Sequence, residues 1–272
     1  MERRKPGGAC MQASIIIVNY NSQPYLEKCL TSIANHTEIP YEVIIVDNHS
    51  TDDSVFFLQK IKHSYLRVIF NQKNFGYATA CNQGLKLASG PLLITMNPDV
   101  VVPPTWLSRL SWHLSNNPKT LMVGPKSMGI GGRQWAGPLT FSRHLEAADR
   151  KFAGLYHRQS ESAKFLIGCL ILFDRRLIDK IGYFDENLPL GADDFDLALR
   201  IRKSGYELRI AKDVLIEHAI HASFNRSNPE ETERLVSISW KHFHQKWGKE
   251  LQEYGWKRLF EDDRPVFVQN TL

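Results

Sequence analysis

Five short apolar runs, separated by longer amphipathic stretches, constrain the fold of this chain more than any other feature. The runs cover residues 14–19, 41–47, 66–71, 91–97 and 120–124. Their consecutive isoleucines, valines and leucines are typical of strands buried on both faces of a sheet. The stretches between them, residues 23–36, 51–62, 77–89 and 103–117, carry apolar residues at helical spacing. This alternation predicts an α/β fold with a mostly parallel sheet flanked by helices.

The second half of the chain is less regular. Residues 128–164 show weak periodicity and predict a loop-rich segment or a lid. A strand followed by a short helix is expected in residues 164–182, and a well-marked helix in residues 191–205. Residues 207–218 predict one or two strands. An amphipathic helix is expected from residue 228 to residue 248, followed by a tail.

Composition and charge exclude several classes of protein. The net charge of +5 over 272 residues is too small and too dispersed to indicate nucleic-acid binding. No window reaches the roughly 18 to 20 apolar residues needed to span a bilayer. Four widely spaced cysteines without a Cys-x-x-Cys pair predict reduced thiols. We therefore expect a cytoplasmic protein, and a peripheral contact with the inner face of the cell membrane is left open.

Polar side chains follow the predicted strands. They are Asn19, Asn21, Asp47, Asn48, Asn71, Asn97 and Asp99. Because ligands of parallel sheets bind at the carboxyl ends of the strands, we expect these residues to surround a binding site.

Seven segments, in this order, carry a family resemblance. They are IIIVNYNS, VIIVDNHSTDDS, NFGYATACNQG, MNPDV, GYFDENL, ADDFDLALRIRKSGYEL and IEHAIHAS. The series resembles family 2 glycosyltransferases of the GT-A fold, and the rhamnosyltransferase-like branch in particular. The matching region covers residues 14–223, about three quarters of the chain.

The resemblance implies an activity and a division of the chain. It implies an inverting glycosyltransferase that moves a sugar from a UDP- or dTDP-linked donor to an acceptor hydroxyl. The acceptor is expected to be a saccharide or a lipid-linked saccharide of a cell-surface polysaccharide or glycolipid. On the Rossmann-like GT-A pattern, residues 12–225 form the catalytic domain, with a nucleotide-sugar half (12–125) and an acceptor half (126–225). Residues 226–272 form a C-terminal helical extension.

The resemblance also assigns donor-binding residues. Asp47 is expected to accept hydrogen bonds from the nucleotide base, although the same residue type is typical of a turn or a helix cap. Asn74 and Gly76 lie at a predicted helix start, where free backbone N–H groups favour an anion. Asn82 lies in mid-helix, where asparagine is a poor helix former. The predicted nucleotide-sugar site comprises Asn19, Asn21, Asp47, Asn48, Asn74, Gly76, Asn82, Asn97 and Asp99.

A divalent cation, Mg²⁺ or Mn²⁺, is the expected cofactor. Sugar transfer releases a nucleoside diphosphate, and a hard cation bound by carboxylate and phosphate oxygens neutralises its charge. Asp99 matches the second acid of the family's Asp-x-Asp motif, whereas Asn97 replaces the first. His218 is expected to support the metal, with His221 as the alternative. The simpler interpretation of residues 97–99 is an Asn-Pro-Asp turn that ends a strand.

Three acids begin the predicted helix at residues 191–205. Acids are favourable near a helix N-terminus, but Asp193, Asp194 and Asp196 also repel one another. On the resemblance, Asp194 is the catalytic base that deprotonates the acceptor hydroxyl, and like charge would raise its pKa usefully. Asp193 is expected to contact the acceptor or the donor, and Asp196 to be structural.

Other functions fit the sequence less well. A catalytically inactive nucleotide-sugar-binding scaffold would keep the fold but would need no base. A nicotinamide-dependent oxidoreductase would require a glycine-rich turn after the first strand, where this chain has NYNSQP. A weak hypothesis concerns the irregular segment, where aromatic and arginine side chains could contact the acceptor or the diphosphate. These residues are Arg133, Trp135 and Arg143.

Overall fold

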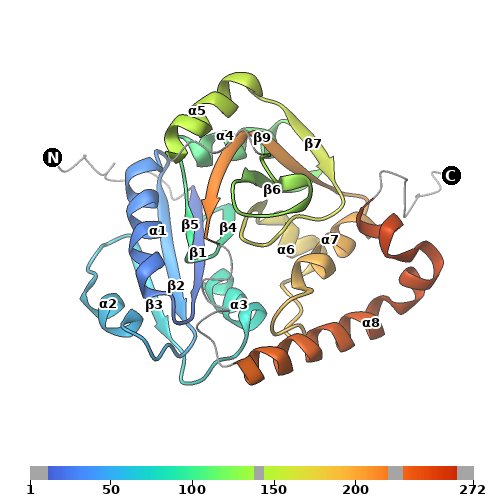
Figure 1. Ribbon diagram of the computed structural model, residues 1–272, viewed down its shortest axis with the longest axis horizontal. Coiled ribbons are helices and arrows are strands. Elements are labelled where there is room, and N and C mark those ends of the chain that lie inside the picture. The colour runs from blue at the N-terminus through green and yellow to red at the C-terminus, as the bar shows by residue number, and fades with distance from the viewer. Residues whose placement is uncertain (1–11, 138–143, 220–228, 262–272) are drawn as a thin grey trace.

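The computed structural model describes residues 12–137, 144–219 and 229–261 and contains one mixed sheet. The strands lie in the order β3-β2-β1-β4-β8-β6-β9-β5, and β7 pairs with β9 (Figure 1). Their bounds are β1 (Ala13–Asn19), β2 (Tyr41–Asp47), β3 (Leu66–Phe70), β4 (Leu92–Met96), β5 (Val100–Val101), β6 (Thr120–Ser127), β7 (Ser160–Ala163), β8 (Leu170–Asp174) and β9 (Glu207–His218).

The first four strands are parallel, as the sequence predicts. Ile17 of β1 pairs with Ile45 of β2 and with Met96 of β4, so the carboxyl ends of these strands lie at one edge. β8 then runs antiparallel between β4 and β6. The predicted α/β fold is confirmed.

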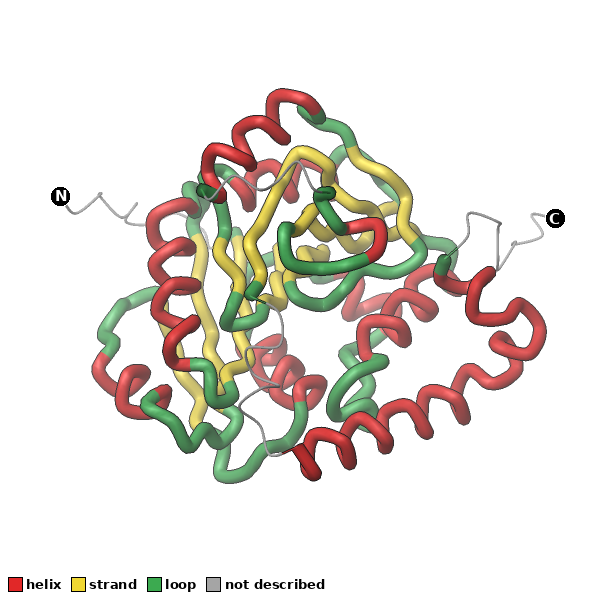
Figure 2. Tube along the Cα trace, viewed as in Figure 1, coloured by secondary structure: helices red, strands yellow, loops and turns green. Residues whose placement is uncertain are grey.

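Helices cover both faces of the sheet (Figure 2). Their bounds are α1 (Gln23–His36), α2 (Ser54–Lys60), α3 (Tyr77–Leu87), α4 (Trp106–Ser115), η1 (Gly132–Gln134), α5 (Leu145–Leu155), α6 (Arg176–Ile181), α7 (Asp193–Lys203) and α8 (Pro229–Phe260). Side chains alternate along β1: Ile15 and Ile17 join the core with α1 and α4, whereas Ile16 joins the core with α3 and α7. Such alternation explains why β1 and β2 carry consecutive apolar residues, at 15–18 and 43–46.

β3 departs from the prediction of strands buried on both faces. Arg67 and Phe70 of this strand are exposed, because β3 lies at the edge of the sheet and pairs only with β2 among the described strands.

The prediction of a loop-rich segment over residues 128–164 is wrong for much of its length. This region contains η1, α5 and β7. Ala148 and Phe152 of α5 pack against Leu215 of β9, and β7 pairs with the same strand. These elements are stabilised by contacts with a distant strand, which local periodicity does not reveal. Residues 138–143, including Arg143, lie outside the described residues.

The predicted tail after residue 248 is also wrong for its first part. α8 continues to Phe260, with a bend at Gly255, whose φ is +70°. Trp256 and Phe260 pack on Phe195 of α7, with ring centroids 5.0 and 4.9 Å from its ring. α8 therefore shares an aromatic core with the helix that carries the predicted base. Of the described helices, none combines the length and the apolar character needed to cross a bilayer.

The packing of α3 on β1 provides a test of the fold. A Cβ at Gly84 would lie 2.5 Å from Ile16 Cγ2, so this fully buried side chain would have to shift within a packed core. We expect Gly84→Ala to lower the free energy of unfolding by about 1–3 kcal/mol, measured by urea denaturation. Gly248→Ala in α8 is the matched control, because its Cβ meets open space, and we expect it to stabilise the protein by about 0.5–1 kcal/mol. Equal effects in the two variants would contradict this account.

Candidate active site

Asn19 and Asp47 lie opposite each other at the carboxyl ends of β1 and β2. Asn19 Nδ2 donates to Asp47 Oδ1 at 2.8 Å and to Ser50 Oγ at 3.1 Å. Asp47 Oδ2 accepts the Ser50 backbone N–H at 3.0 Å. Both oxygens of Asp47, which is 1% exposed, are therefore engaged within the protein. Asp47 fixes the loop that follows β2, and its contact with a nucleotide base stays a prediction.

Asn21 joins the same loop from the other strand. Its Oδ1 accepts the backbone N–H groups of Thr51 at 2.7 Å and Asp52 at 3.3 Å. Its φ of +49° is in the left-handed region, which asparagine tolerates better than most residues. Asn21 therefore holds the loop after β1 against the loop after β2.

Asn48 and Asn74 connect the end of β2 to the segment before α3. Asn48 Nδ2 donates to Asn74 Oδ1 at 2.7 Å and to the Gly76 carbonyl at 3.2 Å. A Cβ at Gly76 would lie 2.6 Å from the Pro189 carbonyl oxygen, and the φ of Gly76 is +83°. Tyr77 N–H, the first of α3, donates to that carbonyl at 2.6 Å. This N–H is therefore not free for an anion, contrary to the expectation for this helix start.

Asn82 has a structural partner that the sequence did not indicate. Its Nδ2 donates to the Phe184 carbonyl at 2.9 Å, and its Oδ1 accepts the Phe184 N–H at 3.1 Å. Nδ2 also lies 2.9 Å from Glu186 Oε1. Asn82 therefore binds the loop before α7 to α3, which is the structural reason for an asparagine in mid-helix.

Asn97, Asp99 and His218 come together although 119 positions separate Asp99 from His218 (218 − 99). After the turn at residues 97–99, Val100 of β5 pairs antiparallel with His218 of β9. His218 Nε2 lies 3.2 Å from Asp99 Oδ1 and 3.4 Å from Asn97 Nδ2. Asp99 and the His218 side chain are both largely buried. His221 lies outside the described residues.

This pair fits a hard divalent cation as a partial donor set. Two neighbouring ligands of an octahedral ion with bonds of about 2.1 Å lie about 3 Å apart, close to the observed spacing of Oδ1 and Nε2. Among the described residues, no group of three or more His, Cys, Asp or Glu side chains is arranged to hold a metal. Asp99 and His218 would therefore need further oxygen ligands from a bound molecule.

Asp193 and Asp194 occupy the first turn of α7. Asp194 Oδ1 accepts the Phe195 N–H at 2.8 Å, and the carboxylate also accepts a backbone hydrogen bond from Gly168. Burial raises the pKa of both carboxyls, and the charge of Asp194 raises the pKa of Asp193 further. This is the environment expected for a proton acceptor near neutral pH.

Asp196 has a different environment. It pairs with Arg200 at 2.7 Å and Lys246 at 2.8 Å, and it accepts a hydrogen bond from Trp247 Nε1 at 2.9 Å. Asp196 thus holds α8 on α7, in agreement with the structural role expected for it.

The segment before β8 connects the two groups, and sequence analysis did not single it out. The Cys169 carbonyl accepts the Asn97 N–H at 2.8 Å, while the adjacent Gly168 bonds Asp194. Burial and the charges of Asp99 and Asp194 together raise the pKa of the Cys169 thiol to about 12. The turn before β8 therefore meets the Asn-Pro-Asp segment through Asn97, and it meets the start of α7 at Gly168, where an added Cβ would lie 3.8 Å from Asp194 Cβ. Cys29 and Cys81 are also buried free thiols, as predicted, whereas Cys10 lies outside the described residues.

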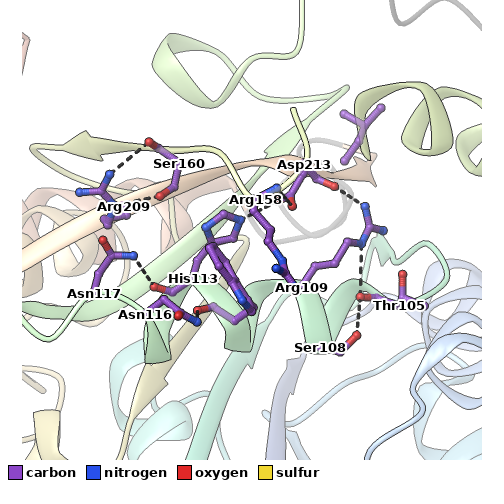
Figure 3. Close-up of polar contacts among 12 residues, drawn as sticks. Thr105, Ser108, Arg109, His113, Asn116, Asn117, Arg158, Ser160, Arg209 and Asp213 are labelled. Carbon is purple, nitrogen blue, oxygen red and sulfur yellow. Dashed lines mark hydrogen bonds and ion pairs between the residues drawn. The ribbon is translucent and has the colours of Figure 1, made fainter. Parts of the chain in front are cut away.

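A buried polar network fixes β9 a few residues before His218 (Figure 3). His113 Nε2 lies 2.7 Å from Asp213 Oδ1, and the Arg158 N–H donates to Asp213 Oδ2 at 2.9 Å. Arg109 also donates to the Asp213 carbonyl. These bonds lie where the register of β9 against β6 shifts between Pro125 and Lys126. The irregular backbone at this place is therefore held from α4 and from the segment after α5.

Comparison with known proteins identifies the family of this chain. The sequence profile of Glycosyl transferase family 2 matches residues 14–182. The chain belongs to glycosyl transferase family 2. An uncharacterized glycosyltransferase of Haemophilus influenzae is 24% identical over 84% of this chain and 72% of its own length. The N-acetylglucosaminyl-diphospho-decaprenol L-rhamnosyltransferase of Mycobacterium tuberculosis is 24% identical over 77% of this chain and 76% of its own length.

A solved structure shares the fold of this family 2 glycosyltransferase. GalNAc-T7, crystallised with UDP, GalNAc and Mn²⁺, superposes with a TM-score of 0.63 at 17% identity. The similarity covers 92% of this chain and half of that chain. The predicted GT-A fold and the predicted enzyme class are therefore confirmed.

The buried acids of this glycosyltransferase predict a pH-dependent stability. When folding raises the pKa of a carboxyl, the free energy of unfolding of the protein falls as the pH rises above the pKa of that carboxyl in the unfolded chain, about 3.9. Asp193→Asn removes the cost of ionising this buried group. We therefore expect its free energy of unfolding to rise relative to wild type from about pH 4 into the neutral range, measured by denaturation at several pH values. Asp53→Asn, at an exposed position, is the control, and an equal gain there would show that burial is not the cause.

Proposed function

We propose that this glycosyltransferase moves a sugar, with inversion, from a UDP- or dTDP-linked donor to an acceptor hydroxyl. The observation that carries the proposal is the position of Asp99, with His218, and of Asp194 around the same turn at Gly168 and Cys169. A group for the diphosphate and a group for the acceptor must both lie close to the sugar that is transferred. The position of Asp99 and Asp194 beside one turn supports the proposal.

In the proposed reaction Asp194 accepts the proton of the acceptor hydroxyl. Its backbone hydrogen bonds from Phe195 and Gly168 hold the carboxylate in one orientation, and its raised pKa makes it a stronger base. Inversion requires a single base on the face of the sugar opposite the leaving group. The proposed role of Asp193 is contact with the acceptor or the donor.

Asp99 and His218 are proposed to bind a divalent cation, Mg²⁺ or Mn²⁺, with Asn97 beside them. When bound, the cation neutralises the charge that develops on the departing diphosphate. Asn97 lacks the charge of the family's first acid, so this chain offers one carboxylate where the two-acid motif offers two. The Mn²⁺ in the related GalNAc-T7 structure supports the assignment.

The acceptor is proposed to be a saccharide, free or lipid-linked, of a cell-surface polysaccharide or glycolipid. The name of the mycobacterial relative, which describes transfer of rhamnose to a lipid-linked N-acetylglucosamine, supports this class. In this proposal, the predicted site around Asn19, Asn21 and Asp47 selects the donor nucleotide and its sugar.

Replacement of the proposed base provides a direct test. We expect Asp194→Asn to lower kcat by about 10²-fold or more, because the acceptor proton loses its carboxylate, while donor binding stays near wild type. Turnover is measured as nucleoside diphosphate release, and binding as the thermal shift produced by UDP or dTDP. Asp179→Asn, an exposed acid on α6, is the control and should retain wild-type turnover. Unchanged kcat in Asp194→Asn would remove it as the base.

A nucleotide panel with and without Mn²⁺ tests the cation site. We expect UDP or dTDP to raise the melting temperature of wild type more strongly with Mn²⁺ than with EDTA, since ligands that bind only the folded state stabilise it. Asp99→Ala and His218→Ala should lose most of this Mn²⁺-dependent difference. His242→Ala is the matched control, because His242, on α8, also lies 3.2 Å from an aspartate, Asp185.

Each contrary result has a defined meaning. A Mn²⁺ response that survives in both Asp99→Ala and His218→Ala would contradict the metal assignment. A shift with NAD alone would contradict the donor class. Nucleotide binding by a wild-type protein that turns over no donor would favour the inactive scaffold.

A further inference from the structure

Trp135 is the one exposed tryptophan of this chain. All six tryptophans lie in the described residues, and Trp106 and Trp247 are buried in the core. Trp135 is 51% exposed and follows η1, which Figure 2 shows as a short red turn within the loop after β6. An exposed tryptophan leaves a large apolar surface in water, and nothing in the packing of the core requires this.

The backbone that carries Trp135 is firmly fixed. The neighbouring Gln134 is buried, its Oε1 accepts the Ile167 N–H at 2.7 Å, and its Nε2 donates to the Pro125 carbonyl at 3.1 Å. Trp135 forms a parallel bridge with Ser127, and the next N–H, of Ala136, donates to the Ser127 carbonyl at 3.0 Å. The exposed ring thus projects from a well-anchored segment.

This segment adjoins both parts of the proposed site. Ile167, which bonds Gln134, directly precedes Gly168, whose backbone bonds the proposed base Asp194. On the other side, Ser127 pairs with Ile216 of β9, two residues before His218. Trp135 therefore lies at the end of β6 beside the turn that joins Asp99 to Asp194.

The charges near Trp135 favour a neutral ligand. Lys126 Nζ lies 3.1 Å from Glu161 Oε1, and Arg133 Nη2 lies 3.7 Å from Glu161 Oε2. Both cations are thus paired with a carboxylate of β7. A phosphate here would have to compete with Glu161 for them, so the hypothesis of a diphosphate contact by Arg133 loses support.

We propose that Trp135 is the platform on which the sugar ring of the acceptor stacks. One face of a pyranose presents C–H groups, which lose contact with water when they pack on the indole face, while the hydroxyls at the ring edge remain free to reach Asp194. This inference rests on the proposed function and adds a binding residue for the acceptor.

The test measures sugar binding without turnover. The probes are the methyl glycosides of glucose, galactose, rhamnose and N-acetylglucosamine, each added with UDP and observed by saturation-transfer NMR. We expect wild type to saturate the ring C–H protons of at least one glycoside, and Trp135→Ala to lose that signal about 5-fold or more. Trp135→Phe should retain most of the signal, because it keeps an aromatic face.

Two controls separate this role from a loss of structure. Phe56→Ala removes another exposed aromatic, on α2, and should bind the glycosides as wild type does. The UDP thermal shift of Trp135→Ala should equal that of wild type. Equal saturation by Trp135→Ala and wild type, or no saturated glycoside with wild type, would overturn the platform. The proposed transfer is tested separately. If wild type releases no nucleoside diphosphate, the proposed function fails, whatever the result with the glycosides.

Discussion

The antiparallel pairing of β5 with β9 is the interaction on which the candidate site depends. β5 has only two residues, Val100 and Val101, yet it sets His218 opposite the end of the Asn-Pro-Asp turn. The Ala219 N–H donates to the Asp99 carbonyl at 3.2 Å and continues the contact. Without this pairing, Asp99 and His218 would belong to distant parts of the chain, and the proposed cation site would not form.

A second constraint acts on the acids of α7. Three carboxylates in one helical turn repel one another, and the fold separates their roles by giving them different surroundings. Asp196 is neutralised by Arg200 and Lys246, whereas no ion pair with Asp193 or Asp194 forms within the described residues, and both of these acids are desolvated. The same helix thus contains one acid that stabilises the packing of α8 and two whose pKa values are raised. α8 contributes to the site by packing behind it, through Trp247 and the aromatic core around Phe195.

Sequence analysis predicted which polar residues lie at the strand ends, but it did not predict the partners of these residues within the protein. The amides of Asn48 and Asn82 bond the backbone of neighbouring segments, and contact of these residues with the donor stays a prediction. Asp47 likewise has both oxygens bonded within the protein. The type and position of such a residue are visible in the sequence, whereas its partners are not, because they come from segments up to about a hundred residues away. Gln134 and Gly168 were missed for the same reason, since a single glutamine or glycine in an irregular segment gives no local signal.

Local sequence patterns alone were enough to predict the α/β class, the succession of the first four strands along the chain and their parallel direction, and the edge of the sheet at which polar residues gather. These follow from local apolar periodicity and from the rule that parallel strands end at one edge. The strand order, the antiparallel entry of β8, the packing of α5 and the pairing of β7 on β9, and the approach of His218 to Asp99 emerge only from the folded structure. Such contacts depend on pairing and burial between segments far apart in the chain, and the side chains that become desolvated there are fixed only when those segments pack together.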